Sequence, residues 1–219
     1  MFSISLDMKD WILVTGGVGY VGSHCVLQIL QAGHHVVIID NLSNASQGQF
    51  GRLFFLLSHM RSSGVISKLE ALSGKTIPLH KVDLTVKEDI RTVFGEYTTS
   101  HSRIVSVIHF AALKSVGESC KEPLRYYQTN VTGSLNLMEV MMEFNVKKIV
   151  YSSSATVYGQ PQYLPIDENH PTGNCTNPYG KSKLFMEEIF KVSKSNWKLK
   201  NKRQCRKRHF LIYLFFNLH

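Results

Sequence analysis

Three glycines spaced three residues apart separate an apolar run from a helix-forming stretch near the start of the chain. Residues 11–15 are apolar and β-branched, which is typical of a strand, and residues 20–32 carry aliphatic side chains at helical spacing. Gly16, Gly19 and Gly22 lie at this junction, where missing side chains let the backbone turn tightly and bring N–H groups to a phosphate at the helix N-terminus. The pattern predicts a strand, turn and helix that bind a pyrophosphate; a tight turn without a ligand is the alternative.

Apolar runs and helical stretches keep alternating along the chain. We predict further strands over residues 35–40, 77–82, 104–109 and 148–152, and helices over residues 53–72, 86–97, 124–145 and 180–192. Residues 43–51 are polar and predict a loop, and the first of these helices should break near residues 62–64. The run at 35–40 is apolar throughout, as expected when helices cover both faces of a sheet. The chain therefore has the pattern of an α/β protein with a doubly wound parallel sheet.

Asp40 ends the second predicted strand. A carboxylate at this place can accept hydrogen bonds from the ribose hydroxyls of an adenosine, and it would repel a 2′-phosphate. Taken with the three glycines, Asp40 predicts NAD rather than NADP as the cofactor. An ordinary aspartate in the turn after a strand is the alternative interpretation.

Tyr179 and Lys183 are four residues apart, so they share one face of a predicted helix. A lysine cation next to a phenol favours the phenolate, which lowers the pKa of tyrosine toward the range of a general base. Such a pair is common by chance. Here it follows a predicted strand that leads into Ser154, and open α/β sheets place reacting groups at the ends of strands.

The formal charge of +9 is confined to the end of the chain. Nine of the 25 basic residues, and no acidic residue, lie in residues 191–219, so residues 1–190 are neutral overall. A nucleic-acid partner is therefore not expected except through this basic tail.

No apolar run approaches the roughly 20 residues that a membrane span needs. Residues 1–10 carry three charges where a signal peptide would be apolar, so we expect a cytoplasmic protein without a membrane partner. Four widely spaced cysteines and ten scattered histidines show no ligand spacing, which predicts reduced thiols and no metal site.

Four strings of residues carry a family resemblance. They are TGGVGYVGSH at 15–24, HFAALKSVGES at 109–119, SSSATVYG at 152–159 and NPYGKSK at 177–183. In this order they resemble the UDP-glucose 4-epimerases of the extended short-chain dehydrogenase/reductase superfamily, over about residues 11–190. The resemblance implies an NAD-binding Rossmann domain and an isomerase of galactose metabolism that interconverts UDP-glucose and UDP-galactose.

By this resemblance, Tyr179 takes the proton from the sugar 4-hydroxyl while hydride passes from C4 to the nicotinamide of NAD. The resulting 4-ketose turns in the site and receives the hydride on its other face. Lys183 binds the nicotinamide ribose and lowers the pKa of Tyr179, and Ser154 hydrogen-bonds the reacting oxygen. Related dehydratases carry an acidic residue after this serine, whereas Ala155 and Thr156 follow it here, which favours epimerisation.

The resemblance also implies binding residues. Those implied for the cofactor are Gly16, Gly19, Tyr20, Val21, Gly22, Asp40, Asn41, Leu42, Ser43, Asn44, Asp83, Leu84, Phe110, Lys114 and Lys183. Those implied for the UDP-sugar are Ser154, Ala155, Thr156 and Tyr179. Ala112 stands where we expect a glycine in this family.

The resemblance stops near residue 190. Residues 198–205 would bring unpaired charges into a sheet, and residues 210–216 form an apolar run too short for a bilayer. We therefore predict an NAD-binding Rossmann domain at 1–190 and a basic, then apolar, tail at 191–219, with the last strand and the substrate domain missing. A truncated, non-catalytic NAD-binding remnant and another NAD-dependent nucleotide-sugar enzyme remain alternatives. The helices at 124–145 and 180–192 could pair two copies in a homodimer.

Overall fold

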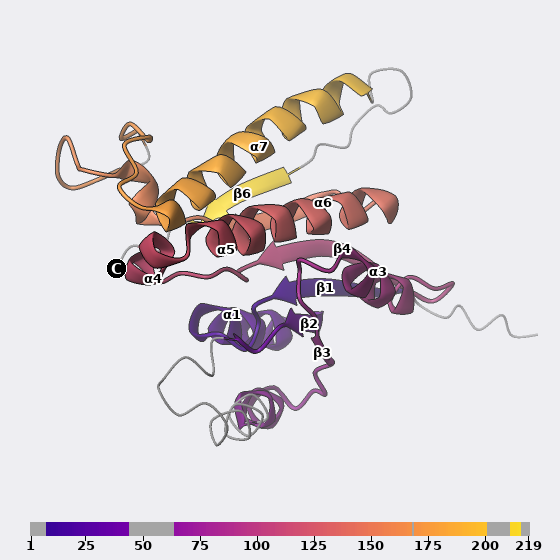
Figure 1. Cartoon of the computed structure of the whole chain (residues 1–219). Coiled ribbons are helices and arrows are strands. Elements are labelled where there is room, and N and C mark those ends of the chain that lie inside the picture. The colour runs from indigo at the N-terminus through magenta and orange to yellow at the C-terminus, as the bar shows by residue number, and fades with distance from the viewer. Residues whose placement is uncertain (1–7, 44–63, 168, 201–210, 216–219) are drawn as a thin grey trace, which may run out of the picture.

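The computed structural model describes residues 8–43, 64–167, 169–200 and 211–215. Within them, one sheet has its strands in the order β3-β2-β1-β4-β5-β6, with every neighbouring pair parallel (Figure 1). The strands are β1 (Lys9–Thr15), β2 (His35–Asp40), β3 (Leu79–Lys81), β4 (Ser102–His109), β5 (Lys148–Ser152) and β6 (Leu211–Phe215). From β1 the chain adds β2 and β3 on one side, then crosses over and adds β4, β5 and β6 on the other side. This strand order is typical of doubly wound dinucleotide-binding folds. The predicted fold class is confirmed.

The connecting helices follow the predicted alternation. They are α1 (Tyr20–Gln31), α3 (Lys87–Glu96), α4 (Val116–Lys121), α5 (Pro123–Tyr127), α6 (Gly133–Glu143) and α7 (Pro178–Lys200), with a further helical stretch at 64–73. The long helix predicted at 124–145 is divided into α5 and α6 by the π-helical turn Gln128–Thr132. Residues 44–63, which hold most of the predicted loop and the first half of the predicted helix at 53–72, lie outside the described residues.

The two faces of the sheet are covered by different helices. Along β2, Val36 and Ile38 pack against α1 and the helical stretch at 64–73, whereas Val37 and Ile39 face α3, α6 and α7. Figure 1 shows α6 and α7 on one side of the sheet and α1 on the other. Burial on both faces explains why this strand is apolar at every internal position.

The expectation that the last strand is missing is wrong. β6 (Leu211–Phe215) pairs in parallel with all five residues of β5. The charged segment after α7 does not supply this strand; the short apolar run does. Without β6, β5 would be an edge strand with unpaired backbone N–H and C=O groups, and an apolar β-forming segment satisfies them.

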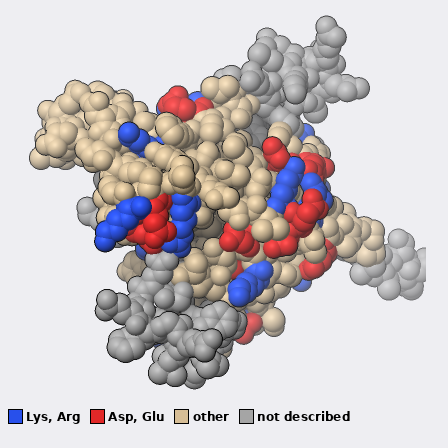
Figure 2. Space-filling model, in the orientation of Figure 1, with Lys and Arg blue, Asp and Glu red and all other residues tan. Residues whose placement is uncertain are grey.

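Charged side chains alternate in sign on the face shown in Figure 2. Between α3 and α6, Lys87 Nζ lies 2.6 Å from Glu139 Oε2, and Arg91 Nε lies 2.7 Å from Glu143 Oε2. Such exposed pairs stabilise little individually, but they keep this surface free of a single-sign patch. None of the helices among the described residues is long and apolar enough to cross a membrane.

Candidate active site

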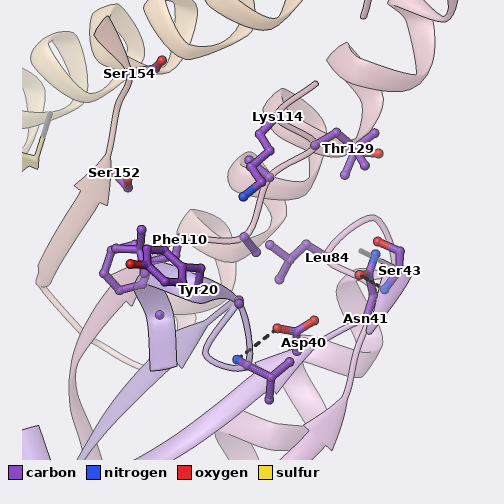
Figure 3. A pocket seen from close by; sticks show the side chains of 18 of the residues that line it. Tyr20, Asp40, Asn41, Ser43, Leu84, Phe110, Lys114, Thr129, Ser152 and Ser154 are labelled. Atoms are coloured by element: carbon purple, nitrogen blue, oxygen red, sulfur yellow. Dashed lines mark hydrogen bonds between the residues drawn. The ribbon is translucent and has the colours of Figure 1, made fainter. Parts of the chain in front are cut away.

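The carboxyl ends of β1, β2, β4 and β5 surround one cavity of about 840 Å³. Figure 3 shows side chains from these strand ends pointing into it. Predicted site residues that line the cavity are Gly16, Gly19, Tyr20, Val21, Gly22, Asp40, Asn41, Leu42, Ser43, Asp83, Leu84, Phe110, Lys114, Ser154, Ala155, Thr156, Tyr179 and Lys183. Asn44 lies outside the described residues. The structure therefore brings every described member of the predicted set to one place, while their individual roles stay predictions.

The glycine turn leaves no room for side chains. Gly16 has φ +68°, and a Cβ added to it would lie 2.7 Å from the backbone nitrogen of Ala111. A Cβ at Gly22 would lie 2.2 Å from the carbonyl oxygen of Gly16. The turn is closed by a hydrogen bond that the backbone N–H of Gly19 donates to the same oxygen over 3.1 Å. Backbone of β1 and α1 can therefore approach a ligand closely.

Helix α1 begins at this turn without a side-chain cap on its Gly19 N-cap. The first N–H groups of a helix have no partner within the helix, and the helix dipole adds partial positive charge there. A phosphate bound at this end of α1 would accept hydrogen bonds from these N–H groups and would be attracted by the partial positive charge. The geometry is that of an anion site built from backbone alone.

The carboxylate of Asp40 is fixed beside the turn. It accepts hydrogen bonds from the backbone N–H of Leu42 at 2.9 Å and of Val18 at 3.4 Å, the second drawn in Figure 3. Burial raises the pKa of Asp40, and these two N–H groups oppose that rise by favouring the charged form. The result is a partly buried carboxylate held against the glycine turn.

Lys183 on α7 lines the cavity and is buried. Only 3% of its surface is exposed, and its Nζ donates to the carbonyl oxygen of Ser152 over 2.7 Å. The same nitrogen lies 4.7 Å from the centre of the Tyr151 ring. Burial lowers the pKa of Lys183 to about 7, so charged and neutral forms coexist near neutral pH.

Tyr179 and Ser154 form a second polar group in the cavity. Burial raises the pKa of Tyr179, and a hydrogen bond from Ser154 opposes the rise. The Ser154 hydroxyl accepts from the hydroxyl and the backbone N–H of Thr156, at 3.0 and 3.3 Å, which leaves its own proton free to be donated. Loss of water around the phenol outweighs the bond from Ser154, and the lowering of the pKa of Tyr179 by Lys183 stays a prediction.

A network of buried hydrogen bonds lies next to the cavity, and the sequence did not predict it. His109 joins the hydroxyl of Thr15, at 2.6 Å from Nδ1, to that of Ser134, at 2.8 Å from Nε2. Asn130 continues the network, since its amide donates to Ser182 on α7 over 3.1 Å. One signal was present: His109 is a polar residue that ends an apolar strand. Its partners are distant in sequence, so spacing alone did not identify them.

The hydroxyl of Tyr151 is the one buried side-chain polar atom of the described residues that has no hydrogen-bond partner. The ring is 1% exposed and packs against Phe190. A buried, unsatisfied hydroxyl costs about 1–3 kcal/mol, so Tyr151→Phe should leave the free energy of unfolding unchanged or raise it by about 1 kcal/mol. Urea denaturation of both proteins would measure this, with Tyr163→Phe as the contrast, since its hydroxyl donates to Asp167 over 2.8 Å and that bond would be lost. A clear loss of stability in Tyr151→Phe would show that the hydroxyl has a partner.

The comparisons with known proteins agree with this geometry. The family model described as GDP-mannose 4,6 dehydratase matches residues 13–205. The chain belongs to that family. A UDP-glucose 4-epimerase of Drosophila melanogaster is 50% identical over 180 residues, which are 82% of this chain and 47% of the fly protein. A UDP-glucose 4-epimerase of Homo sapiens is 46% identical over 184 residues, 84% of this chain and 49% of the human protein.

A solved structure shows the same likeness within the family. The UDP-glucose 4-epimerase of Bifidobacterium longum, crystallised in complex with NAD⁺ and UDP, superposes with a TM-score of 0.72 at 38% identity. The match covers 85% of this chain and 49% of the bacterial one. The predicted resemblance to UDP-glucose 4-epimerases is confirmed. The chain spans about half the length of the relatives it matches.

The arrangement can move a proton and bind a dinucleotide, but it offers no metal site within the described residues, where no group of three His, Cys, Asp or Glu side chains could hold an ion. Cys25, Cys120 and Cys175 are free thiols, and Cys205 lies outside the described residues. A phenol, a hydroxyl and an amine in one cavity are suited to acid–base chemistry on an alcohol.

Proposed function

We propose that this chain is the NAD-binding part of an enzyme that interconverts UDP-glucose and UDP-galactose. The observation that carries the proposal is the single cavity in which the backbone cradle of the glycine turn faces Tyr179, Ser154 and Lys183. The glycine turn is needed for cofactor binding, and the three polar side chains are needed for proton transfer at the sugar 4-hydroxyl. The relatives named above support the substrate, because they are UDP-glucose 4-epimerases.

The residues present fit NAD. A Cβ at Gly16 or Gly22 would meet backbone atoms of Ala111 or of the turn itself, so only glycine lets the turn close tightly and present its backbone to a pyrophosphate. Asp40 would bind the adenosine ribose, Asp83 and Leu84 would line the adenine, and Phe110 and Lys114 would line the nicotinamide end. When bound, NAD would accept the hydride from C4 of the sugar and return it.

The chain's own groups would handle the proton. Tyr179 would take it from the 4-hydroxyl and give it back, and Ser154 would hold the sugar oxygen next to the phenol. The ammonium of Lys183 would stabilise the phenolate while the sugar is a ketone. Because burial raises the pKa of Tyr179, a positive charge near the phenol is needed for it to act as a base near neutral pH.

Epimerisation fits the cavity better than elimination of water. The acidic residues that line it are Asp40, at the end of β2, and Asp83, after β3. Ala155 and Thr156 follow Ser154. Elimination from the sugar needs an acid close to the reacting carbons. None of the described residues that line the cavity supplies one beside Ser154.

The test is Tyr179→Phe. We expect the purified chain to carry NAD, seen by absorbance and mass after denaturation, and to turn over UDP-galactose at a rate that falls about 100- to 10,000-fold in this variant. NAD content should not change, because the phenyl ring remains. Exposed Tyr163→Phe is the matched control and should keep full activity. A wild-type chain without bound NAD would contradict the proposal.

A second candidate follows from the share of the relatives that the chain covers, 47% of the fly protein. Much of a substrate's binding energy comes from parts of the protein that do not react, so a chain without them can keep the cofactor and lose turnover. NAD content without activity in the wild-type chain would favour such a non-catalytic NAD-binding protein.

Two copies would pair through the helices that carry Tyr179 and precede it. Exposed apolar side chains there support this: Leu124 on α5 is 80% exposed and Phe185 on α7 is 48% exposed. The Phe185 ring also stacks on that of Tyr127, with centres 5.9 Å apart. Analytical ultracentrifugation of the purified chain would measure the assembly.

Contact of the basic tail with nucleic acid and a cytoplasmic location both stay predictions. Part of the tail, residues 201–210 and 216–219, lies outside the described residues. A salt-sensitive RNA shift that disappears on deletion of residues 191–219 would support the first, and cell fractionation would test the second.

A further inference from the structure

One stripe of α7 is held by three consecutive serines at the end of β5. Tyr179, Lys183 and Glu187 follow one another at intervals of four, so they face the same side of the helix. Each meets a different serine: Lys183 bonds to Ser152, Glu187 to Ser153 and Tyr179 to Ser154. The first two of these serines were not among the predicted site residues, and neither was Glu187.

Glu187 is an uncommon residue for its position. Only 2% of its surface is exposed, and the Ser153 hydroxyl donates to its Oε1 over 2.5 Å. Burial raises the pKa of Glu187; the bond from Ser153 and the charges of Lys191 and Lys183 oppose this rise, and the charge of Glu188 adds to it. Burying a carboxylate costs several kcal/mol of folding free energy unless an opposite charge or hydrogen bonds compensate. We therefore expect this glutamate to interact with a positively charged side chain.

The partner is Lys183, one helical turn away. Burial disfavours its ammonium form, and the negative charge of Glu187 favours it. Lys191 and Glu188 on α7 also act on Glu187, but they are exposed and pair with each other. The titratable groups that face Lys183 from other positions supply no negative charge. His109 on β4 is neutral, Tyr151 on β5 is a buried phenol, and Tyr179 lies on α7 itself.

We propose that Glu187 is a positioning residue that favours the protonated form of Lys183 and holds α7 in register against the serines at the end of β5. The residue does not line the cavity and would not touch substrate or cofactor. Its importance for catalysis rests on the proposed function, in which the ammonium of Lys183 stabilises the phenolate of Tyr179. With Glu187 neutral, that ammonium would lose its proton at lower pH.

The test reads the charge of Lys183 directly. The full chain is labelled with ¹³Cε-lysine, the Lys183 signal is assigned by its loss in Lys183→Met, and its chemical shift is followed with pH. In Glu187→Gln, which keeps the shape and a hydrogen-bonding amide, the acid dissociation constant of Lys183 should rise about tenfold. The matched control is Glu188→Gln: Glu188 lies next in sequence, is exposed and pairs with Lys191, so Lys183 should titrate as in the wild type.

A reciprocal measurement keeps the proposal testable if Glu187→Gln does not fold. Lys183→Met replaces a buried ammonium by an apolar chain of similar length, and the ¹³C signal of the Glu187 carboxyl should then titrate at higher pH, because one Coulomb energy acts on both partners. An unchanged titration of Lys183 in Glu187→Gln, or of Glu187 in Lys183→Met, would overturn the proposal. Neither experiment contains NAD or substrate, so a failure of NAD binding in a parallel assay would count against the proposed function alone.

Discussion

Gly22→Ala should remove dinucleotide binding and lower stability. The added Cβ would lie 2.2 Å from the carbonyl oxygen of Gly16 and 2.9 Å from Cα of Gly17. Both are backbone atoms, so no rotation of a side chain can relieve the clash, and the turn must move away from α1. We expect the free energy of unfolding to fall by about 3 kcal/mol, as for severe overpacking. The affinity for NAD should fall at least about 100-fold, since the displaced N–H groups are the ones that would bind the pyrophosphate.

Gly95→Ala is the matched control for this experiment. Gly95 lies within α3, and a Cβ added there meets no atom within 4 Å. Alanine is the better helix former, so this variant should gain about 0.5 kcal/mol and bind NAD like the wild type. Urea denaturation and isothermal titration with NAD would compare the three proteins. Wild-type stability and NAD affinity in Gly22→Ala would show that α1 and the turn are not in the close contact described.

Much of the site could be predicted because parallel strands bring their carboxyl ends to one edge of a sheet. Gly16, Asp40 and Ser154 are far apart in sequence, but each lies at or just after the carboxyl end of a strand of the same sheet. Once the alternation of strands and helices was recognised, their meeting in one cavity followed from topology. Tyr179 joined them because its helix starts after the strand that leads to Ser154.

The features that sequence reasoning missed are contacts between distant segments. Ser153 and Glu187 are 34 residues apart, and Thr15 and His109 are 94 apart. No spacing rule connects such pairs. The pKa of Tyr179 shows a related limit: helical spacing indicates a neighbouring lysine but does not indicate how much water the fold removes from the phenol.

The strand β6 was missed for a different reason. Whether an apolar run at the end of a chain pairs with an existing sheet depends on the free edge that the sheet offers, and this is a property of the folded domain. The sequence shows only that the run is apolar and β-forming. The charged residues between α7 and β6 made the segment as a whole look unsuited to a sheet.

His109 should make the chain lose stability in acid. The Ser134 hydroxyl donates to the carbonyl oxygen of Asn130 over 2.5 Å, so Nε2 of His109 must donate to Ser134. On the other side, the N–H of Ala111 donates to the Thr15 hydroxyl at 3.1 Å, and that hydroxyl in turn donates to Nδ1. Both ring nitrogens are therefore occupied in the neutral form. Burial, and next the positive charge of Lys183, lower the pKa of His109 to about 3.

The direction of this stability change follows from the pKa of His109 in the unfolded chain and in the folded chain. In the unfolded chain, His109 takes up a proton near its ordinary pKa of 6.5, whereas in the folded chain it does so only near 3. Between these values the unfolded state binds more protons, so stability is lost as the pH falls through this window. At up to about 1.36 kcal/mol for each pH unit, the loss is about 2 kcal/mol at pH 5 and about 4 kcal/mol at pH 3.

The measurement is the free energy of unfolding in urea between pH 7 and pH 4, for the wild type and for His109→Gln. Glutamine offers one donor and one acceptor but does not titrate, so the variant starts from a lower stability at pH 7 and should decline less steeply below pH 6.5. Its difference from the wild type should shrink by about 2 kcal/mol by pH 5. His101→Gln, at an exposed histidine, should follow the wild-type slope. Parallel curves for the wild type and His109→Gln would mean that the ring takes up its proton equally in the folded and unfolded chain, which a buried histidine with both nitrogens occupied cannot do.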